Sequence, residues 1–525
     1  MCLPAYLARA RTEQLWFVLP LATALVLIAP VWLVTNQPSM DGPSHLAELY
    51  VLTNSQNPVT RSPFYEVQWS ATPDLAAELV VPVLNQIFPF TVSVKLFLSL
   101  AILFWAVGPG LVQSALYGRQ YATSLAAGLL AYNANFFNGF WNCYFGLGLA
   151  LVIFSLWIRW SSHFSLWRRV ALALAFLATY ACHLVAAVGL LILLIGYETH
   201  RFRRGACVLR TLAVAIGNPL LTILPALVAA LFRPSGAGSG ASRDFFLNFG
   251  GRVHALLQVG LPSGEKLFIP LLLILFGLAW FAGYIRVHAS MRRLIFVFAL
   301  ICVVVPVWAG GGWGLHIRYP ALLGAVALAS CAVVAEERTQ LAAAAASLAC
   351  VAIASLALLF VWKRIDAQTD EYRTALRQIP VAAKTMLVVD DRTGPSARAY
   401  PYFHIGAYAV IDRNAFFAGL LTTRGQHVVY PRSEFRTISA RASDDSLPVS
   451  YTQLRALEKA APSSKVSRTG HPNLRNWPCT FDIVTVIGAE PTTALPELRL
   501  RHRGSFFSIY AVHRPSDCGL TADDP

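Results

Sequence analysis

The sequence predicts a polytopic α-helical membrane protein of about eleven helices, followed by a soluble external α/β domain. Hydrophobic residues make up 56% of its 525 residues and charged residues only 13%, about half the charged share of ordinary soluble domains. Apolar runs long enough to cross a bilayer recur up to residue 362, and shorter apolar segments typical of buried strands replace them afterwards. We therefore expect a membrane domain at residues 1–362 and a soluble domain at residues 363–525.

The arginines predict how the chain is oriented. Arg9 and Arg11 precede the first apolar run, so we expect the N-terminus in the cytoplasm. That run can cross the bilayer and no small-x-small cleavage site follows it, which favours an uncleaved helix over a signal peptide. The runs expected to form the membrane helices are 15–34, 91–113, 121–137, 144–158, 170–197, 208–231, 267–285, 294–308, 320–334 and 341–362, of which 170–197 is counted as two helices. The Arg content of alternate loops then leaves residues 36–90, 233–266 and 363–525 on the external side.

Charge and motifs exclude several classes of protein. The net charge of +15 fits a membrane protein, because much of the Arg lies in short loops between apolar runs. No nucleic-acid-binding motif accompanies it, so we expect no nucleic-acid partner. No Walker A, HExxH, CxxC, Gly-x-Ser-x-Gly or Rossmann motif lies in a supporting context, which argues against an ATP-driven pump, a zinc protease and a serine hydrolase.

The run at residues 170–197 conflicts with a single crossing. As one helix it would be about 42 Å long, against a bilayer core of about 30 Å. A single crossing would also place the arginines of residues 201–210 outside, against the positive-inside rule. Two short helices that turn at residues 181–183 remove both conflicts and place His183 at the external end, in a recessed corner of the bundle. His183 then either forms a hydrogen bond at a helix end or lines a site.

The first external loop begins with the stretch PSMDGPSHLAE at residues 38–48. Pro43 suits the first position of a helix, so we expect a helix from there to about residue 54. Two interpretations stay open: Asp41 caps this helix and His45 is a surface residue, or Asp41 and His45 face a site. Farther along, residues 74–88 have apolar residues at helical spacing and two carboxylates, which predicts a helix lying on the membrane.

The predicted topology gathers polar residues on the external side, near the membrane surface. They are Asp41, His45, Glu48, His183, His316 and Arg318, with Tyr319 beside the last of them. Such a place suits a lipid-linked substrate, whose tail stays in the bilayer while its head group lies at the interface. Asp41 can act there as general base toward an acceptor hydroxyl or hold a divalent cation, and His45 can orient Asp41 or contact a departing phosphate. Arg318 can bind phosphate through paired N–H bonds, or it only anchors a helix end at the interface.

The soluble domain is expected to contain strands at residues 386–390, 481–487 and 505–513 and helices at residues 371–379 and 454–460. It also holds Cys479 and Cys518, which can pair if the external compartment is oxidising. Most other cysteines lie in or beside apolar runs, where Cys behaves as a small buried residue.

The arrangement resembles the GT-C class of integral-membrane glycosyltransferases, which use polyprenyl-phosphate sugars. Members carry an acidic residue in the first external loop, just after the first helix, and interfacial helices in that loop. Asp41 in the sequence MDGPSHL matches this position, although many members have an Asp/Glu pair where Asp41 has His45 as its near partner. The helix pair turning at His183, the segment Arg318-Tyr319-Pro320 at a late helix, and the soluble domain are similar to features of bacterial members. The resemblance covers about residues 10–362 as architecture.

The resemblance implies a transferase that moves a sugar, with inversion, from a polyprenyl-phosphate donor to a glycan, lipid or protein acceptor at the external face of a bacterial inner membrane. The predicted site then has Asp41 and His45 as catalytic residues, and Glu48, His183, His316, Arg318 and Tyr319 as substrate-binding residues. No cofactor is certain, and a divalent cation, Mg or Mn, is an option. A transporter or flippase of lipid-linked glycans and a non-catalytic scaffold that displays the soluble domain remain alternatives. A transporter needs polar residues at mid-membrane depth, whereas this sequence concentrates them at one interface.

Overall fold

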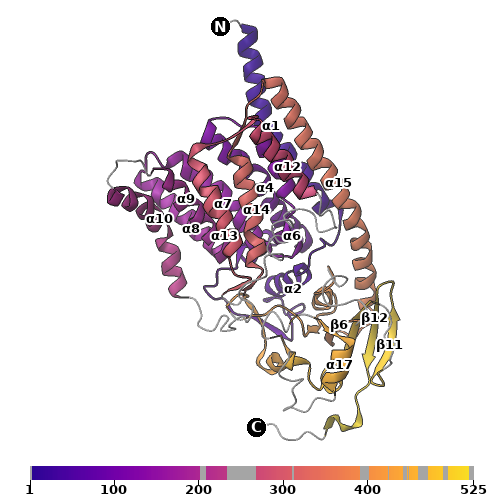
Figure 1. Ribbon diagram of the computed structural model, residues 1–525. Helices are drawn as coiled ribbons and strands as arrows, with labels where there is room; N and C mark the ends of the chain where they lie inside the picture. The colour runs from indigo at the N-terminus through magenta and orange to yellow at the C-terminus, as the bar shows by residue number, and fades with distance from the viewer. Residues whose placement is uncertain are drawn as a thin grey trace.

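The computed structural model describes residues 3–201, 208–232, 268–309, 312–390, 401–423, 425–440, 446, 448–458, 471–488 and 495–519. The predicted external loop at residues 233–266 lies outside this part of the chain. Figure 1 shows a bundle of helices with a smaller, sheet-containing domain below it, and the N-terminus at the far end of the bundle. The predicted class, a helical protein with a C-terminal domain that contains a sheet, is confirmed at this level.

Long apolar helices form the bundle, with α7 near its centre. Their bounds are α1 (Leu3–Leu33), α4 (Phe90–Tyr117), α7 (Trp141–Trp160), α8 (Leu166–Cys182), α9 (Leu184–Glu198), α10 (Val208–Leu231), α12 (Phe268–Phe281), α13 (Arg292–Val304), α14 (Leu315–Ala329) and α15 (Glu337–Leu376). Helix α7 packs against α4, α8 and α9, and most of its side chains are buried. Among the described helices, α4, α7 and α15 are long and apolar enough to cross a membrane, while several other apolar helices are shorter. The eleven crossings therefore stay a prediction.

The corner expected within residues 170–197 is present. Helices α8 and α9 meet at His183, whose backbone is extended with φ −170° and ψ 136°. The two helices pack against each other, so the chain turns back instead of continuing as one helix. The first external loop covers this corner, because the backbone amide of Leu184 donates to the carbonyl of Pro73. The prediction of a split pair is confirmed.

Residues 121–137 do not form the single crossing helix that we expected. They form the short pieces α5 (Ala122–Ala126), η1 (Ala127–Leu130) and α6 (Ala134–Phe137). The backbone is extended at Asn133, whose side chain accepts a hydrogen bond from the amide of Asn135 and so starts α6. The pieces are buried in the bundle, where protein groups rather than lipid satisfy the interrupted backbone. The prediction was wrong because a buried irregular segment is as apolar as a crossing helix.

Helix α14 starts five residues before its predicted start at Pro320. Gly314 precedes it in the left-handed conformation, with φ 82°, after the hairpin of β3 (Trp308–Ala309) and β4 (Gly312–Trp313). Arg318 and Tyr319 therefore lie inside the first turns of α14 rather than before it.

Helix α15 is longer than predicted. It has 40 residues, or about 60 Å at 1.5 Å per residue, and it includes most of the segment 371–379 that we expected as a separate helix. The predicted domain boundary at residue 362 falls inside it. Figure 1 shows α15 running from the bundle to the sheet of the C-terminal domain.

The C-terminal domain is built on a mixed sheet with the strand order β11-β12-β10-β6-β7, in which β9 also pairs with β6. The strands are β6 (Lys384–Val389), β7 (Phe416–Phe417), β9 (Val449–Ser450), β10 (Ile483–Ile487), β11 (Leu498–Arg503) and β12 (Phe507–Val512), and the helices are α16 (Tyr408–Arg413), α17 (Tyr451–Glu458) and α18 (Trp477–Thr480). The three predicted strands correspond to β6, β10 and β12, and the predicted helix at residues 454–460 to α17. Buried strands read as continuous apolar runs, which made them visible in the sequence.

The remaining described elements are short. They are α3 (Ala76–Leu84), η2 (Thr199–Arg201), β2 (Ile285–Val287), η3 (Ala289–Met291), β5 (Cys331–Val333), η7 (Ser433–Ile438), η10 (Pro472–Leu474) and η11 (Ser516–Gly519). Cys479 in α18 and Cys518 in η11 form a disulfide with their Cα atoms 5.3 Å apart, so the expected pairing is confirmed.

The first external loop packs into the C-terminal domain. Its strand β1 (Tyr65–Val67) pairs antiparallel with β8 (Val429–Pro431). Its helix α2 (Gly42–Thr53) packs against α16 and η6 (Ile405–Ala407), and apolar residues of α2 belong to the same core as the sheet. Figure 1 shows α2 between the bundle and the sheet. Because paired strands lie on one side of a membrane, the loop and the domain share a side, as the sequence predicted.

Reporter fusions test which compartment that side faces. An enzyme reporter that is active only outside the cytoplasm, fused at Gly238 or at Gly470, should be active at both positions, because the Arg pattern places both in external segments. A reporter that is active only in the cytoplasm should be silent at the same positions. A cytoplasmic signal at Gly470 would show that the predicted number of crossings is wrong.

Candidate functional site

Asp41 stands directly before α2, yet its carboxylate does not cap that helix. Its side chain makes no capping hydrogen bond. Asp41 Oδ1 lies 3.3 Å from His404 Nε2 instead, and the Asp41 amide donates to the carbonyl of Asn138. Gly139 lies against that amide, and a Cβ there would stand 2.8 Å from its nitrogen. The turn after α6 thus fixes the backbone of Asp41, and the carboxylate points to the C-terminal domain.

His404 is supplied by the C-terminal domain, immediately before η6. Its side chain is 1% exposed, whereas that of Asp41 keeps 14% exposure. With a carboxylate opposite, Nε2 is the nitrogen expected to carry the proton, since a carboxylate only accepts hydrogen bonds. A buried imidazole therefore holds a carboxylate that remains reachable, which fits a general base with its positioning group.

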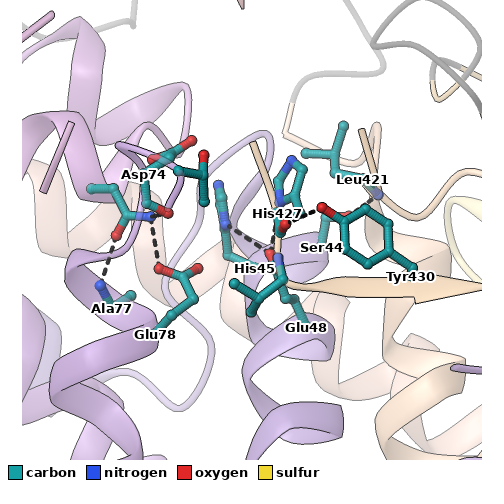
Figure 2. A network of polar contacts seen from close by, with 12 residues as sticks. Ser44, His45, Glu48, Asp74, Ala77, Glu78, Leu421, His427 and Tyr430 are labelled. Atoms are coloured by element: carbon teal, nitrogen blue, oxygen red, sulfur yellow. Dashed lines mark hydrogen bonds and ion pairs between the residues drawn. The ribbon is translucent and has the colours of Figure 1, made fainter. Parts of the chain in front are cut away.

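Nearly two turns along α2, Glu48 joins two imidazoles. Glu48 Oε2 lies 2.8 Å from His427 Nδ1 and 3.8 Å from His45 Nδ1. Glu48 Oε1 accepts a hydrogen bond of 3.2 Å from the amide of Val428. The His45 ring stacks on Trp141 at 5.8 Å between centroids. Figure 2 shows His45 and Glu48 on α2 with His427 reaching them from the C-terminal domain.

Glu48, His427 and His45 differ in their charge, because burial and neighbouring charges shift their pKa values in different directions. Burial alone would lower the pKa of His427, but the charge and hydrogen bond of Glu48, with Asp74 and Glu78 nearby, raise that pKa to about 9. Burial alone would raise the pKa of Glu48, but His427 holds it below its usual value. Burial lowers the pKa of His45. Near neutral pH the group therefore contains an ionised Glu48, a protonated His427 and a neutral His45.

Asp74 and Glu78 add two carboxyl groups beside this group (Figure 2). Asn142 Nδ2 donates to Glu78 Oε2 at 2.9 Å and to the carbonyl of Asp74 at 3.1 Å. Burial raises the pKa of Asp74 to about 6, against the opposing influence of His427, Asn142 and Arg318. Burial and the charges of Glu48 and Asp74 raise the pKa of Glu78 well above its usual value. Burial therefore favours the protonated form of both carboxyl groups.

The helical bundle contributes Arg318 and His183 to the candidate site. Arg318 Nη1 lies 2.8 Å from His183 Nε2, and Arg318 Nη2 donates to the carbonyl of Trp313. His183 Nδ1 accepts from the amide of Val185. A neutral imidazole has one acceptor nitrogen, so His183 cannot accept from Val185 and Arg318 at once. Arg318 is 7% exposed and its Nε has no hydrogen-bond partner among the described residues, which argues against an exposed interfacial anchor.

Tyr319 and His316 are engaged within the bundle. The Tyr319 hydroxyl donates to the carbonyl of Val185 at 3.1 Å, which joins α14 to α9. His316 is buried with its ring edge-to-face against Trp313 at 6.1 Å. The described contacts of Tyr319 therefore show a packing role for its hydroxyl, and its predicted part in substrate binding stays a prediction.

The structure brings most of the predicted site residues into one region. Asp41, His45 and Glu48 lie together between α2 and the C-terminal domain, and Arg318 is near enough to influence Asp74. The imidazole that contacts Asp41 is His404, not the expected His45. Sequence reasoning missed His404 and His427, because neither belongs to a motif and only the pairing of the loop with a distant domain places them here.

No protein-family model matches the chain, and no curated protein matches it either. Among solved structures, the chain is similar to the crystal structure of ArnT from Cupriavidus metallidurans bound to undecaprenyl phosphate. The TM-score is 0.46 and the sequence identity 12%, over 96% of this chain and 98% of that one.

Asp74→Asn should stabilise the protein at neutral pH. Because the folded pKa of about 6 exceeds the ordinary 3.8, the stabilising effect of protonated Asp74 is complete below about pH 4 and is lost as pH rises through about 6. We expect a gain on the order of 1–2 kcal/mol at pH 7, discounted for the partial exposure of the side chain, and none near pH 4. Thermal unfolding of the purified protein at both pH values measures this.

The matched control is Glu66→Gln, which removes a partly exposed carboxylate from the same loop. It should change the unfolding midpoint little at either pH. An Asp74→Asn midpoint equal to or below that of the wild type at pH 7 would contradict the prediction.

Proposed function

We propose that the protein is a glycosyltransferase that moves a sugar from a polyprenyl-phosphate donor to an acceptor hydroxyl at the external face of a bacterial inner membrane. One observation carries the proposal: the reachable carboxylate of Asp41 is held by buried His404 between an apolar bundle and a polar domain. A polyprenyl tail suits the apolar helices, while a sugar and a phosphate suit the polar side chains between the bundle and the C-terminal domain. The nearby Arg318 offers N–H groups that no described residue fully uses.

In this reaction the acceptor hydroxyl gives its proton to Asp41 as its oxygen attacks the anomeric carbon. The bond between that carbon and the phosphate oxygen breaks, and its electron pair leaves with the polyprenyl phosphate. Attack from the face opposite the leaving group inverts the sugar carbon. His404 keeps Asp41 oriented, and Arg318 offsets the charge that develops on the departing phosphate. His45, one turn beyond Asp41, is the residue that we assign to contact with that phosphate.

The placement of the polar residues favours a transferase over the alternatives. The cluster lies where the first external loop, the helix corner at His183 and the C-terminal domain meet. A transporter or flippase of lipid-linked glycans would need polar groups at mid-membrane depth. A scaffold that only displays the domain has no use for a buried group of carboxylates and imidazoles, since their desolvation costs stability.

Asp41→Asn tests the general base. The substitution removes the charge and barely changes the volume, so the protein should fold while transfer falls on the order of a hundredfold or more. The measurement is the release of polyprenyl phosphate, by mass spectrometry, from polyprenyl-phosphate sugars extracted from bacterial membranes, with the same extract as the source of acceptor. Glu66→Gln in the same loop should transfer at the wild-type rate. Wild-type transfer by Asp41→Asn would remove Asp41 from the mechanism.

Arg318→Gln tests the phosphate contact. Loss of a charge-assisted hydrogen bond to the donor should cost about 1.5–3 kcal/mol, or roughly ten- to a hundredfold in kcat/KM for the donor. Arg436→Gln is the matched control, because Arg436 is 58% exposed and pairs with Glu66 on the surface. If Arg318→Gln and Arg436→Gln give the same kcat/KM as the wild type, Arg318 does not bind the donor.

A further inference from the structure

We propose that His45, Glu48 and His427 form a binding site for a divalent transition-metal ion of the Zn²⁺ type, which closes when the C-terminal domain docks on α2. One nitrogen of each imidazole and one oxygen of Glu48 lie within 4.8 Å of one another, and all three residues are buried. This inference concerns binding of the ion and does not depend on the proposed transferase activity.

The separations are close to those of a bound ion. With metal–ligand bonds of about 2.0–2.2 Å, ligands at the corners of a tetrahedron stand about 3.3–3.5 Å apart. Glu48 Oε2 is 2.8 Å from His427 Nδ1 and 3.8 Å from His45 Nδ1. Side-chain shifts of about 1 Å therefore bring the three atoms to coordination distance. The ion would replace the hydrogen bond between His427 Nδ1 and Glu48 Oε2.

The donor set selects the kind of ion. Two imidazole nitrogens and one carboxylate oxygen suit Zn²⁺ and its neighbours, whereas Mg²⁺ prefers oxygen ligands in an octahedral arrangement. The Mg expected as one option from the sequence is therefore less suitable here than Zn²⁺. Three protein ligands leave a fourth position for water or a substrate oxygen, as in catalytic zinc sites.

The surroundings hold the three side chains in place. The amide of Val428 donates to the second oxygen of Glu48, which leaves Oε2 directed at the imidazoles. The Tyr430 hydroxyl donates to the carbonyl of His427 at 2.6 Å and ties down its loop. His45 lies against Trp141 and, among the described residues, its imidazole makes no hydrogen bond, although the residue is only 8% exposed. The contacts of Glu48 and of the loop that carries His427 are of the kind that orient ligands in metal sites.

Metal content of the full-length protein tests the site. The purified protein is stripped with a chelator, reloaded with Zn²⁺ or Co²⁺ alone and desalted, and bound metal is measured by mass spectrometry. We expect about one ion per chain, a Co²⁺ absorption spectrum typical of low-coordinate geometry, and no competition from a large excess of Mg²⁺. His45→Gln is the decisive variant, because it leaves the Glu48–His427 ion pair intact and so should fold. It should weaken Zn²⁺ binding at least tenfold, and His427→Gln should do the same.

His513→Gln, which changes an exposed histidine of the C-terminal domain, should bind Zn²⁺ like the wild type. A wild-type protein that retains no ion after reloading overturns the inference. Zn²⁺ affinity in His45→Gln equal to that of the wild type overturns it too, because the ion would then be held elsewhere. Asp41→Asn separates the two proposals, since it should lose transfer while it retains the ion. Loss of metal binding alone leaves the proposed transfer reaction to be judged by its own assay.

Discussion

The ion pair between Glu48 and His427 is the interaction on which the geometry of the site depends. Both side chains are buried, and their atoms are 2.8 Å apart across 379 residues of sequence. Removing one partner of such a pair typically costs about 3–5 kcal/mol, because the other charge stays buried without compensation. The pair therefore fixes the orientation of α2 against the C-terminal domain. Asp41 stands at the start of the same helix, and the turn after α6 also holds its backbone.

Further contacts hold the loop that carries α2 between two rigid parts. At its beginning, Asp366 on α15 accepts hydrogen bonds from the amides of Thr35 and Asn36. Along α2, the Ser44 hydroxyl accepts from the amide of Leu421 in the C-terminal domain. Farther on, Asn142 of α7 binds the segment before α3 through its contact with Asp74. Helix α15 continues unbroken from the bundle into the C-terminal domain. These contacts therefore hold α2 against both parts of the molecule.

The sequence predicted the features that depend on neighbouring residues and missed those that depend on contacts between distant segments. The corner at His183 followed from the length of an apolar run and the position of arginines, both of which act over a few tens of residues. The helix after Asp41 and the buried strands followed from Pro43 and from apolar runs. The break at Asn133 was missed because burial in the bundle selects the same apolar residues as lipid does. His404 and His427 were out of reach, since no local pattern says which histidine of a distant domain will meet which carboxylate.

Both of these histidines belong to the C-terminal domain, so the candidate site depends on how that domain packs against the first external loop. Without the C-terminal domain, Asp41 and Glu48 would be loop carboxylates with ordinary surroundings, because His404 and His427 would be absent and water would reach them. In the folded chain the domain covers both carboxylates and supplies both imidazoles. Burial also raises the pKa of Asp74 and Glu78, which means that the docked state holds carboxyl groups at a cost in stability. A fold selected for stability alone would favour apolar groups at these positions, and the proposed donor and metal sites would give the burial of these carboxyl groups a function.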